Sequence, residues 1–235
     1  MTLPEIMQQL QQLGNESTKS VLVKHGAREP FFGVKIEDLK KIVKKAKTDY
    51  PLSLELFNTG NSDAMYLAGL IADPAKMSRE DLNDWVETAY WYMLSEFTVA
   101  WVASESPFGT ELALQWIESD KENIASAGWA TLASIAACKN DEEIDAILYR
   151  NLLKRISSTI HSEKNRVRSA MNNFVISVGG YCKPLSEDAT SIASQIGKVK
   201  VDMGGTACKV PLATDYIQKM RARNKSWKKR KSARC

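Results

Sequence analysis

The sequence predicts an all-α protein, a solenoid of stacked helix pairs with one β-hairpin inserted near the C-terminus. Three observations favour this fold. Apolar residues recur at helical spacing along almost the whole chain, Gly and Pro interrupt them at short intervals, and one segment, 198–210, alternates with the period of a strand. The 235 residues are enough to bury a substantial core.

Short amphipathic segments fill the N-terminal half. We expect helices at about residues 4–13, 15–24, 35–47, from Pro51 to Gly60, 62–73, 78–89 and 90–104. Pro4 suits a first helical turn, because its missing N–H would have no partner there. Ser78 and Asp81 resemble a capping box with the shorter acid.

Longer helices are expected in the C-terminal half, at about residues 108–118, 121–138, 141–157, 163–179 and 186–196. Pro74, Pro107, Gly179-Gly180 and Pro184 mark turns between helices. Helix pairs recur roughly every 35–45 residues, which is typical of a HEAT-like solenoid, with an irregular helical bundle as the alternative. The Ala, Ser and Gly content of segment 121–138 indicates a close-packing helix.

The strand-like segment reads KVKVDMGGTACKV, so that valines alternate with lysines up to the Gly204-Gly205 pair. Two short β runs joined by two glycines predict a hairpin, because primed turns need positive φ. A lone hairpin is marginally stable and must lean on the helices or on a partner. Its lysines, Lys198, Lys200 and Lys209, are either solvated surface residues or DNA contacts.

The net charge of +4 hides an asymmetry, because residues 221–235 contain eight Lys and Arg and no acid. The rest of the chain is mildly acidic. A basic cluster binds polyanions through counterion release, and nucleic acid is the commonest polyanion in a cell; a solvated tail is the alternative. We therefore expect one helical domain over residues 1–220, hairpin included, followed by a basic tail.

Several classes of protein are disfavoured. The cysteines, Cys138, Cys182, Cys208 and Cys235, form no C-x-x-C pair, and only His25 and His161 accompany them, so neither a metal site nor a disulfide framework is expected. No cofactor motif stands out. No apolar run reaches the length of a membrane span, and the N-terminus does not resemble a signal peptide. We expect a cytoplasmic monomer without cofactor, metal or membrane contact.

Four stretches are similar to the DNA alkylation repair family, the AlkD-like HEAT-repeat proteins. They are FFGVKIEDLKKIVKK at 31–45, NRVRSAMNNFVISVGGY at 165–181, VDMGGTACKVPLATDYI at 201–217 and the ending KKRKSARC. The resemblance extends over almost the whole chain. It implies a HEAT-like fold and DNA as the partner, and the active members of the family are glycosylases for N3- and N7-alkylpurines.

In the active members a carboxylate and aromatic rings stabilise the cationic sugar as the alkylpurine leaves. The best match to their W-W-D-x-V-D-like motif is SEFTVAWV at 95–102, which places Ala100 at the carboxylate position. Ala127 and Gly128 stand where a following helix carries an Arg pair. Loss of the carboxylate removes several kcal/mol of transition-state stabilisation, so the resemblance favours the AlkF-like branch, which lacks glycosylase activity and is associated with branched DNA.

Glu96 lies one helical turn from Ala100 and is the one alternative catalytic carboxylate. Trp101 and Trp129 are either aromatic faces for such a site or core residues. Trp227 either stacks on an exposed base or anchors the tail.

The candidate DNA contacts fall into three further groups. One helix carries Asn165, Arg166, Arg168, Asn172 and Asn173, which either donate to phosphate and base edges or cross-link neighbouring helices. Lys35 and Lys40 lie on the basic helix expected at 35–47, where a solvated face is the alternative, and the tail contributes Lys228, Lys229, Arg230 and Lys231. We therefore predict a protein that recognises branched or distorted DNA without base excision. An alkylpurine glycosylase and a protein-interaction scaffold are the alternatives.

Overall fold

The computed structural model describes residues 1–234, and these residues form helices, turns and loops but no strand. The N-terminal helices are α1 (Leu3–Leu13), α2 (Glu16–Lys24), α3 (Ile36–Ala46), α4 (Tyr50–Asn58), α5 (Ser62–Ile71) and α6 (Arg79–Thr88). The central and C-terminal ones are the π-helix η1 (Met93–Val99), α7 (Ala100–Glu105), α8 (Gly109–Trp116), α9 (Glu122–Cys138), α10 (Ala146–Thr159), α11 (Asn165–Tyr181), α12 (Ser186–Ile196) and α13 (Ala213–Arg223). Short 3-10 turns, η2 (Asp141–Glu143) and η3 (Lys183–Leu185), flank α10 and α12.

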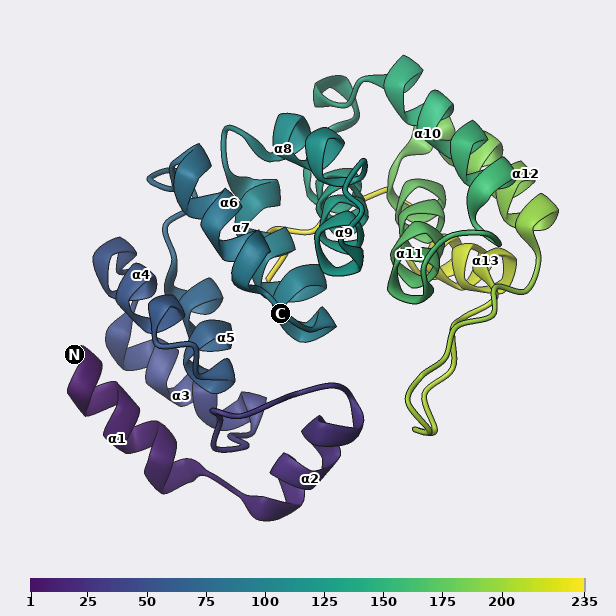
Figure 1. The fold of residues 1–235 in the computed structure, drawn as a ribbon. Helices are drawn as coiled ribbons and strands as arrows, with labels where there is room; N and C mark the ends of the chain where they lie inside the picture. The colour runs from purple at the N-terminus through teal and green to yellow at the C-terminus, as the bar shows by residue number, and fades with distance from the viewer. Residues whose placement is uncertain (235) are drawn as a thin grey trace.

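The helices follow an arc, with α4, α6, α8, α10 and α12 along its outer side and α5, α7, α9 and α11 along its inner side (Figure 1). The inner row forms the core of the solenoid. Every residue of α5 is buried, and so are most residues of α9. This arrangement confirms the predicted all-helical, HEAT-like solenoid.

The helix boundaries follow local capping chemistry. Ser78 and Asp81 form the expected capping box at the start of α6, and Pro4 lies in the first turn of α1. Asp63, in the first turn of α5, accepts backbone N–H groups of residues 32–34 at 2.6–3.0 Å. A buried carboxylate thus fixes the segment that leads into α3.

Glycine permits the closest helix contacts. A Cβ at Gly128 would lie 2.8 Å from the carbonyl oxygen of Ala113, so α8 and α9 pack backbone to backbone, as the Ala, Ser and Gly content of α9 predicts. The prediction that Gly179-Gly180 forms a turn is wrong, because α11 continues through both glycines. They make room for α13, since a Cβ at Gly179 would lie 2.5 Å from Cδ1 of Ile217.

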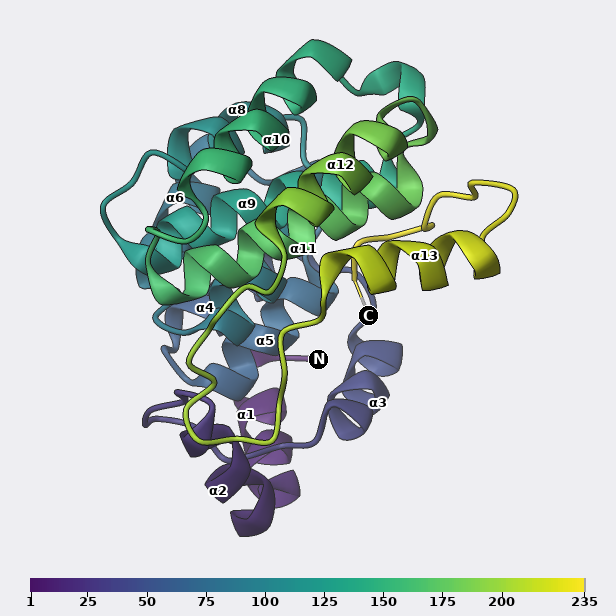
Figure 2. The same ribbon diagram turned by 90° about the vertical axis from the view of Figure 1, so that its right-hand side faces the viewer.

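The predicted β-hairpin at 198–210 is also wrong. Residues 197–212 form a wide loop, called here the basic loop, whose two limbs run apart (Figure 2). The turn itself is present, because Gly204 and Gly205 have φ of 67° and 73°. Two asparagines of α11 replace the partner strand: Asn165 binds the N–H and C=O of Asp202 at 2.7 and 2.8 Å, and Asn172 donates to the carbonyl of Pro211.

The basic C-terminal segment begins within α13, which extends to Arg223, and then runs extended behind the inner helices (Figure 1). It places cations at the C-terminal ends of these helices, where unpaired carbonyls carry partial negative charge. Arg234 donates to the carbonyls of Leu70 and Ala72 at the C-terminal end of α5, and Lys229 donates to the carbonyl of Ala136 in α9. Ala233 is 1% exposed and packs in the N-terminal core, so this segment ties the two halves together.

Among residues 1–234, no helix has the length and apolarity needed to cross a membrane. Within the same residues, no group of three or more His, Cys, Asp or Glu is arranged to hold a metal. Cys138, Cys182 and Cys208 are unpaired, and Cys235 lies outside the described residues.

A chain that ends at Asn224 should be less stable than the full chain. It loses the buried Ala233 and the ion pairs Lys229–Asp141 and Arg234–Glu105. We expect a loss of about 2 kcal/mol, or a Tm lower by ~4–8 °C, in thermal unfolding followed by circular dichroism.

The matched control keeps the segment and replaces three of its exposed lysines, Lys225, Lys228 and Lys231, by Ala. Its Tm should stay within about 1 °C of the wild type, because these side chains are solvated. Equal Tm values for the truncated and full chains would show that the C-terminal segment does not stabilise the fold.

Candidate nucleic-acid interface

A buried ion pair lies on the inner side of the arc, between η1 and the start of α11. Arg166 donates from Nε and Nη2 to the two carboxylate oxygens of Glu96 at 2.8 and 2.7 Å. The guanidinium carbon lies 4.3 Å from the centroid of the Tyr92 ring, and the backbone N–H of Arg166 donates to Glu122. Arg166 is therefore held on three sides, in the bidentate geometry that fixes a guanidinium most firmly.

This pair occupies the carboxylate that the sequence offers as a catalytic group. The Glu96 side chain is only 5% exposed. Burial raises the pKa of its carboxyl, and the hydrogen bonds from Arg166 oppose that shift. Because both oxygens are bound to a guanidinium, Glu96 presents no free anion to a departing base.

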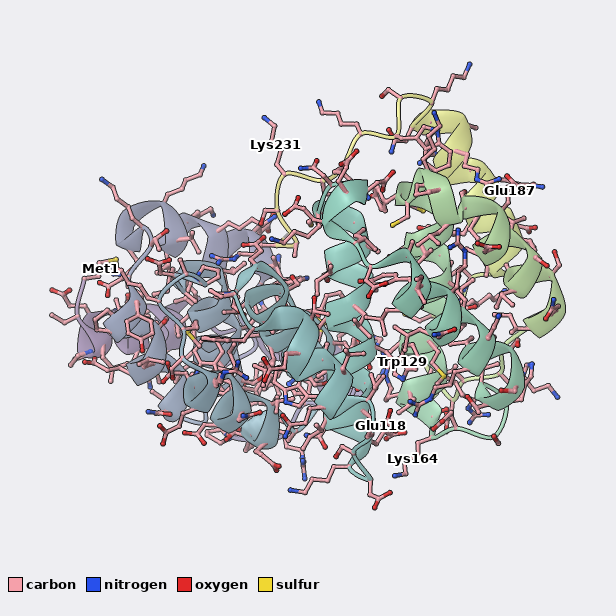
Figure 3. All side chains as sticks on the ribbon, turned by 90° about the horizontal axis from the view of Figure 1, so that it is seen from above. Met1, Glu118, Trp129, Lys164, Glu187 and Lys231 are labelled. Carbon is pink, nitrogen blue, oxygen red and sulfur yellow. The ribbon has the colours of Figure 1, made fainter. Side chains whose placement is uncertain are left out.

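The other residues matched to the glycosylase motifs lie in the core. Ala100, Ala127 and Trp129 are fully buried, and Trp101 is 4% exposed. Trp101 packs edge-on against Tyr66 and Phe97, and Trp129 packs against Phe174 between α9 and α11 (Figure 3). These residues contribute to helix packing. Trp101 and Trp129 are therefore core residues and not aromatic faces of a site.

The basic loop and α11 enclose a cavity of about 440 Å³, called here the basic cavity. Four of the predicted DNA-binding cations line it: Arg168, Lys198, Lys200 and Lys209. Asp202 is the one acid in its lining, and Val199 turns inward while the lysines on either side of it are exposed. A concentration of cations in a concave surface is the arrangement that attracts phosphates.

A second cavity of about 260 Å³, called here the inner cavity, lies on the other side of the Asn165–Asp202 contact. Arg166, Tyr92, His25 and Lys24 line it, together with the tip of the basic loop and two glycines. The Tyr92 hydroxyl and Nδ1 of His25 are 3.1 Å apart and share a hydrogen bond.

The predicted asparagines have different roles. Asn165 lines both cavities but uses its amide to hold the loop. Asn172 is fully buried and donates to the carbonyl of Pro211 at the C-terminal limb of the basic loop. It therefore cross-links two parts of the fold, as one of the two alternatives predicted. Asn173 is exposed on α11.

The remaining candidates lie away from these cavities. Lys231 projects on the opposite side of the row of helices from Lys164, the residue before α11 (Figure 3). Within the tail, Lys229 is bound to Asp141 and only 13% exposed, whereas Lys228, Arg230 and Lys231 are exposed. Trp227 is half-buried with the Arg221 guanidinium 5.8 Å from its ring. The exposed Lys35 and Lys40 belong to the α3 region, which lies on the same side as the tail and not beside the basic loop (Figure 2).

Sequence reasoning missed Lys24, His25 and Tyr92 as neighbours of Arg166. They come from the end of α2 and the start of η1, 67 residues apart for His25 and Tyr92. No local pattern marks them, because only the superhelical arrangement brings these segments together.

Replacing Glu96 by Gln should destabilise the fold by about 3 kcal/mol, measured by urea unfolding, because the largely buried Arg166 guanidinium would lose its paired carboxylate. The Glu96→Leu/Arg166→Met double variant should recover most of that loss, since it removes both charges. If the losses of the single variants Glu96→Leu and Arg166→Met add up to the loss of the double variant, the pair is not coupled.

Comparison with known proteins gives consistent matches along the chain. Residues 6–191 match the DNA alkylation repair enzyme family. The uncharacterised protein Lin0241 of Listeria innocua is 36% identical over 230 residues, 95% of this chain and 99% of its own. Lmo0209 of Listeria monocytogenes is 35% identical over 232 residues, 96% of this chain and 100% of its own.

One solved structure is described as a new family of proteins related to the HEAT-like repeat DNA glycosylases with affinity for branched DNA structures. It aligns over 100% of both chains with a TM-score of 0.91 and 40% sequence identity. Because the family model matches residues 6–191 and this structure aligns over the whole chain, the chain belongs to the DNA alkylation repair enzyme family.

Proposed function

We propose that this protein binds branched or distorted DNA without excising a base, as a member of the AlkF-like branch acting as a cytoplasmic monomer. The observation that carries the proposal is the basic cavity, where Arg168 and three loop lysines converge on one hollow. The similarity to a structure from a family with affinity for branched DNA supports the same partner.

The geometry favours recognition of DNA shape over base sequence. Three of the four cations of the basic cavity sit on a loop that projects from the solenoid, so they would meet phosphates whose spacing depends on the path of the strands (Figure 2). Lys198, Lys200 and Lys209 are exposed and free to bind phosphate. Binding through such groups is sequence-independent and strongly dependent on salt.

The burial of Glu96 and its ion pair with Arg166 are the basis for proposing that no base is excised. Glycosylases of this family place an anion beside the sugar that becomes cationic. Here the one candidate carboxylate is 5% exposed and bound to Arg166, and Ala100 is buried. The same fold is therefore proposed to bind DNA without this transition-state stabilisation.

Replacing Lys198, Lys200 and Lys209 together by Ala should weaken binding to a three-way DNA junction at least about tenfold at ~100 mM salt. The slope of log Kd against log salt should fall by about 2 to 3, because up to three phosphate contacts are lost. Fluorescence anisotropy at several salt concentrations measures both quantities.

The control removes three other lysines, Lys41, Lys76 and Lys139, each already paired with a carboxylate one helical turn or less away. It carries the same change in net charge. If it weakens binding as much as the loop variant does, general charge and not the basic cavity explains the affinity.

Incubation of the protein with methylated DNA should release no more 3- or 7-methylpurine than buffer alone, because no free carboxylate faces the sugar. Chromatography of the released bases measures this, with a known alkylpurine glycosylase as the positive control. Release above the spontaneous rate that disappears in the Glu96→Gln variant would establish the glycosylase alternative.

A further inference from the structure

We propose that the inner cavity receives the base of one unpaired nucleotide at a DNA branch point, while the basic cavity beside it holds the adjoining phosphates. The inference rests on the proposed binding of branched DNA and specifies which part of that DNA the protein recognises. It assigns a separate ligand group to each cavity.

The two cavities differ in charge. In the inner cavity, Glu96 neutralises Arg166, and Asp202 faces the same hollow as Lys24. In the basic cavity, four cations face Asp202 alone among the acids. A phosphate carries a full negative charge and a nucleobase carries none, so the basic cavity suits the backbone and the inner cavity suits a base.

The inner cavity also has the groups that recognise an unpaired base. Such bases stack on aromatic rings or guanidinium planes and form hydrogen bonds along their edges. Arg166 lies against Tyr92 at 4.3 Å, and its bonds to Glu96 use two of five guanidinium N–H donors. The volume of about 260 Å³ is below that of sites for drug-sized ligands, ~300 Å³ or more, and is suited to a single ring system.

The walls of the inner cavity are held together by contacts, although they come from four segments of the chain: the end of α2, the start of η1, α11 and the basic loop. The loop tip touches the end of α2, because a Cβ at Gly204 would lie 2.6 Å from the carbonyl oxygen of Lys24. On the opposite side, the two hydrogen bonds between Asn165 and Asp202 hold the loop to α11. Because Asn165, Asp202 and Met203 border both cavities, a nucleotide can place its base on one side of this contact and its phosphate on the other.

A branch point is the part of a DNA that supplies such a base most easily. Extracting a base from a duplex costs unpairing and unstacking energy, and this cost is least for a base that is already unpaired. The inner cavity therefore favours a junction with an unpaired nucleotide over a continuous duplex.

The test compares three-way junctions that are identical except at the branch: fully paired, with one unpaired thymidine, or with one abasic nucleotide at that position. The full-length protein should bind the thymidine junction about tenfold more tightly than the abasic one, as expected for one stacked base. Equal affinities for the thymidine and abasic junctions overturn the inference. If the protein still binds these junctions, the proposed function is retained. Failure to bind any of the three junctions overturns the proposed function itself.

Two variants of His25 distinguish the effect of filling the inner cavity from the effect of losing the hydrogen bond to Tyr92. His25 is half-buried at the end of α2, outside the core, and bonded to Tyr92. His25→Trp fills the cavity and should bring the ratio of the affinities for the thymidine and abasic junctions close to one. His25→Ala loses the same hydrogen bond but leaves the space, so a preference of several-fold should remain.

A His25→Trp protein that keeps the full preference for thymidine overturns the inference. Loss of the preference in both variants also overturns it, because the space within the cavity would then not be what selects the base. If the Trp variant does not fold, shown by its circular dichroism spectrum, the comparison of thymidine and abasic junctions with the unaltered protein still decides.

Discussion

The buried pair of Arg166 and Glu96 is the contact on which the inner side of the solenoid depends. It joins η1 to α11 across 70 residues of sequence. Desolvation of two charges offsets most of their attraction, so such a pair contributes little net stability and chiefly fixes position. Here it holds a guanidinium against Tyr92 at the wall of a cavity and removes a carboxylate from the concave surface. One interaction therefore fixes a cavity wall and leaves neither carboxylate oxygen of Glu96 unpaired.

The basic loop owes its open form to hydrogen bonds that α11 supplies. The amide of Asn165 offers Asp202 one acceptor and one donor, as a neighbouring strand would, and Asn172 binds the other limb at Pro211. Because these backbone groups bond to side chains of α11, the limbs need not pair with each other and can separate. Direct pairing of the limbs would close the space between them. The basic cavity exists because the loop pairs with the helix and not with itself.

Local sequence determined much of the fold, and long-range contacts determined the rest. The helical periodicity and the Ser78–Asp81 capping box predicted most helices. The alternation around Val199 predicted a strand that does not form, although Val199 is buried between exposed lysines. Gly179-Gly180 was misread because these glycines make room for Ile217, 38 residues later, on α13, a helix that the sequence did not predict. For the site, Arg168 and the loop lysines could be named from sequence, whereas Tyr92 and Lys24 could not, because no local signal relates them to Arg166.

The C-terminal segment shows why a cluster of basic residues is an ambiguous sign of DNA binding. The same composition that attracts polyanions also suits the negative ends of helices. Arg221, Lys229 and Arg234 bind carbonyls at the C-terminal ends of α11, α9 and α5, and each also pairs with an acid. These three cations are therefore already paired with groups of the protein itself. The lysines of the basic loop are fewer, but they are exposed and converge on one cavity. Their position, more than the net charge of the chain, is the reason for proposing that a phosphate backbone binds at this loop.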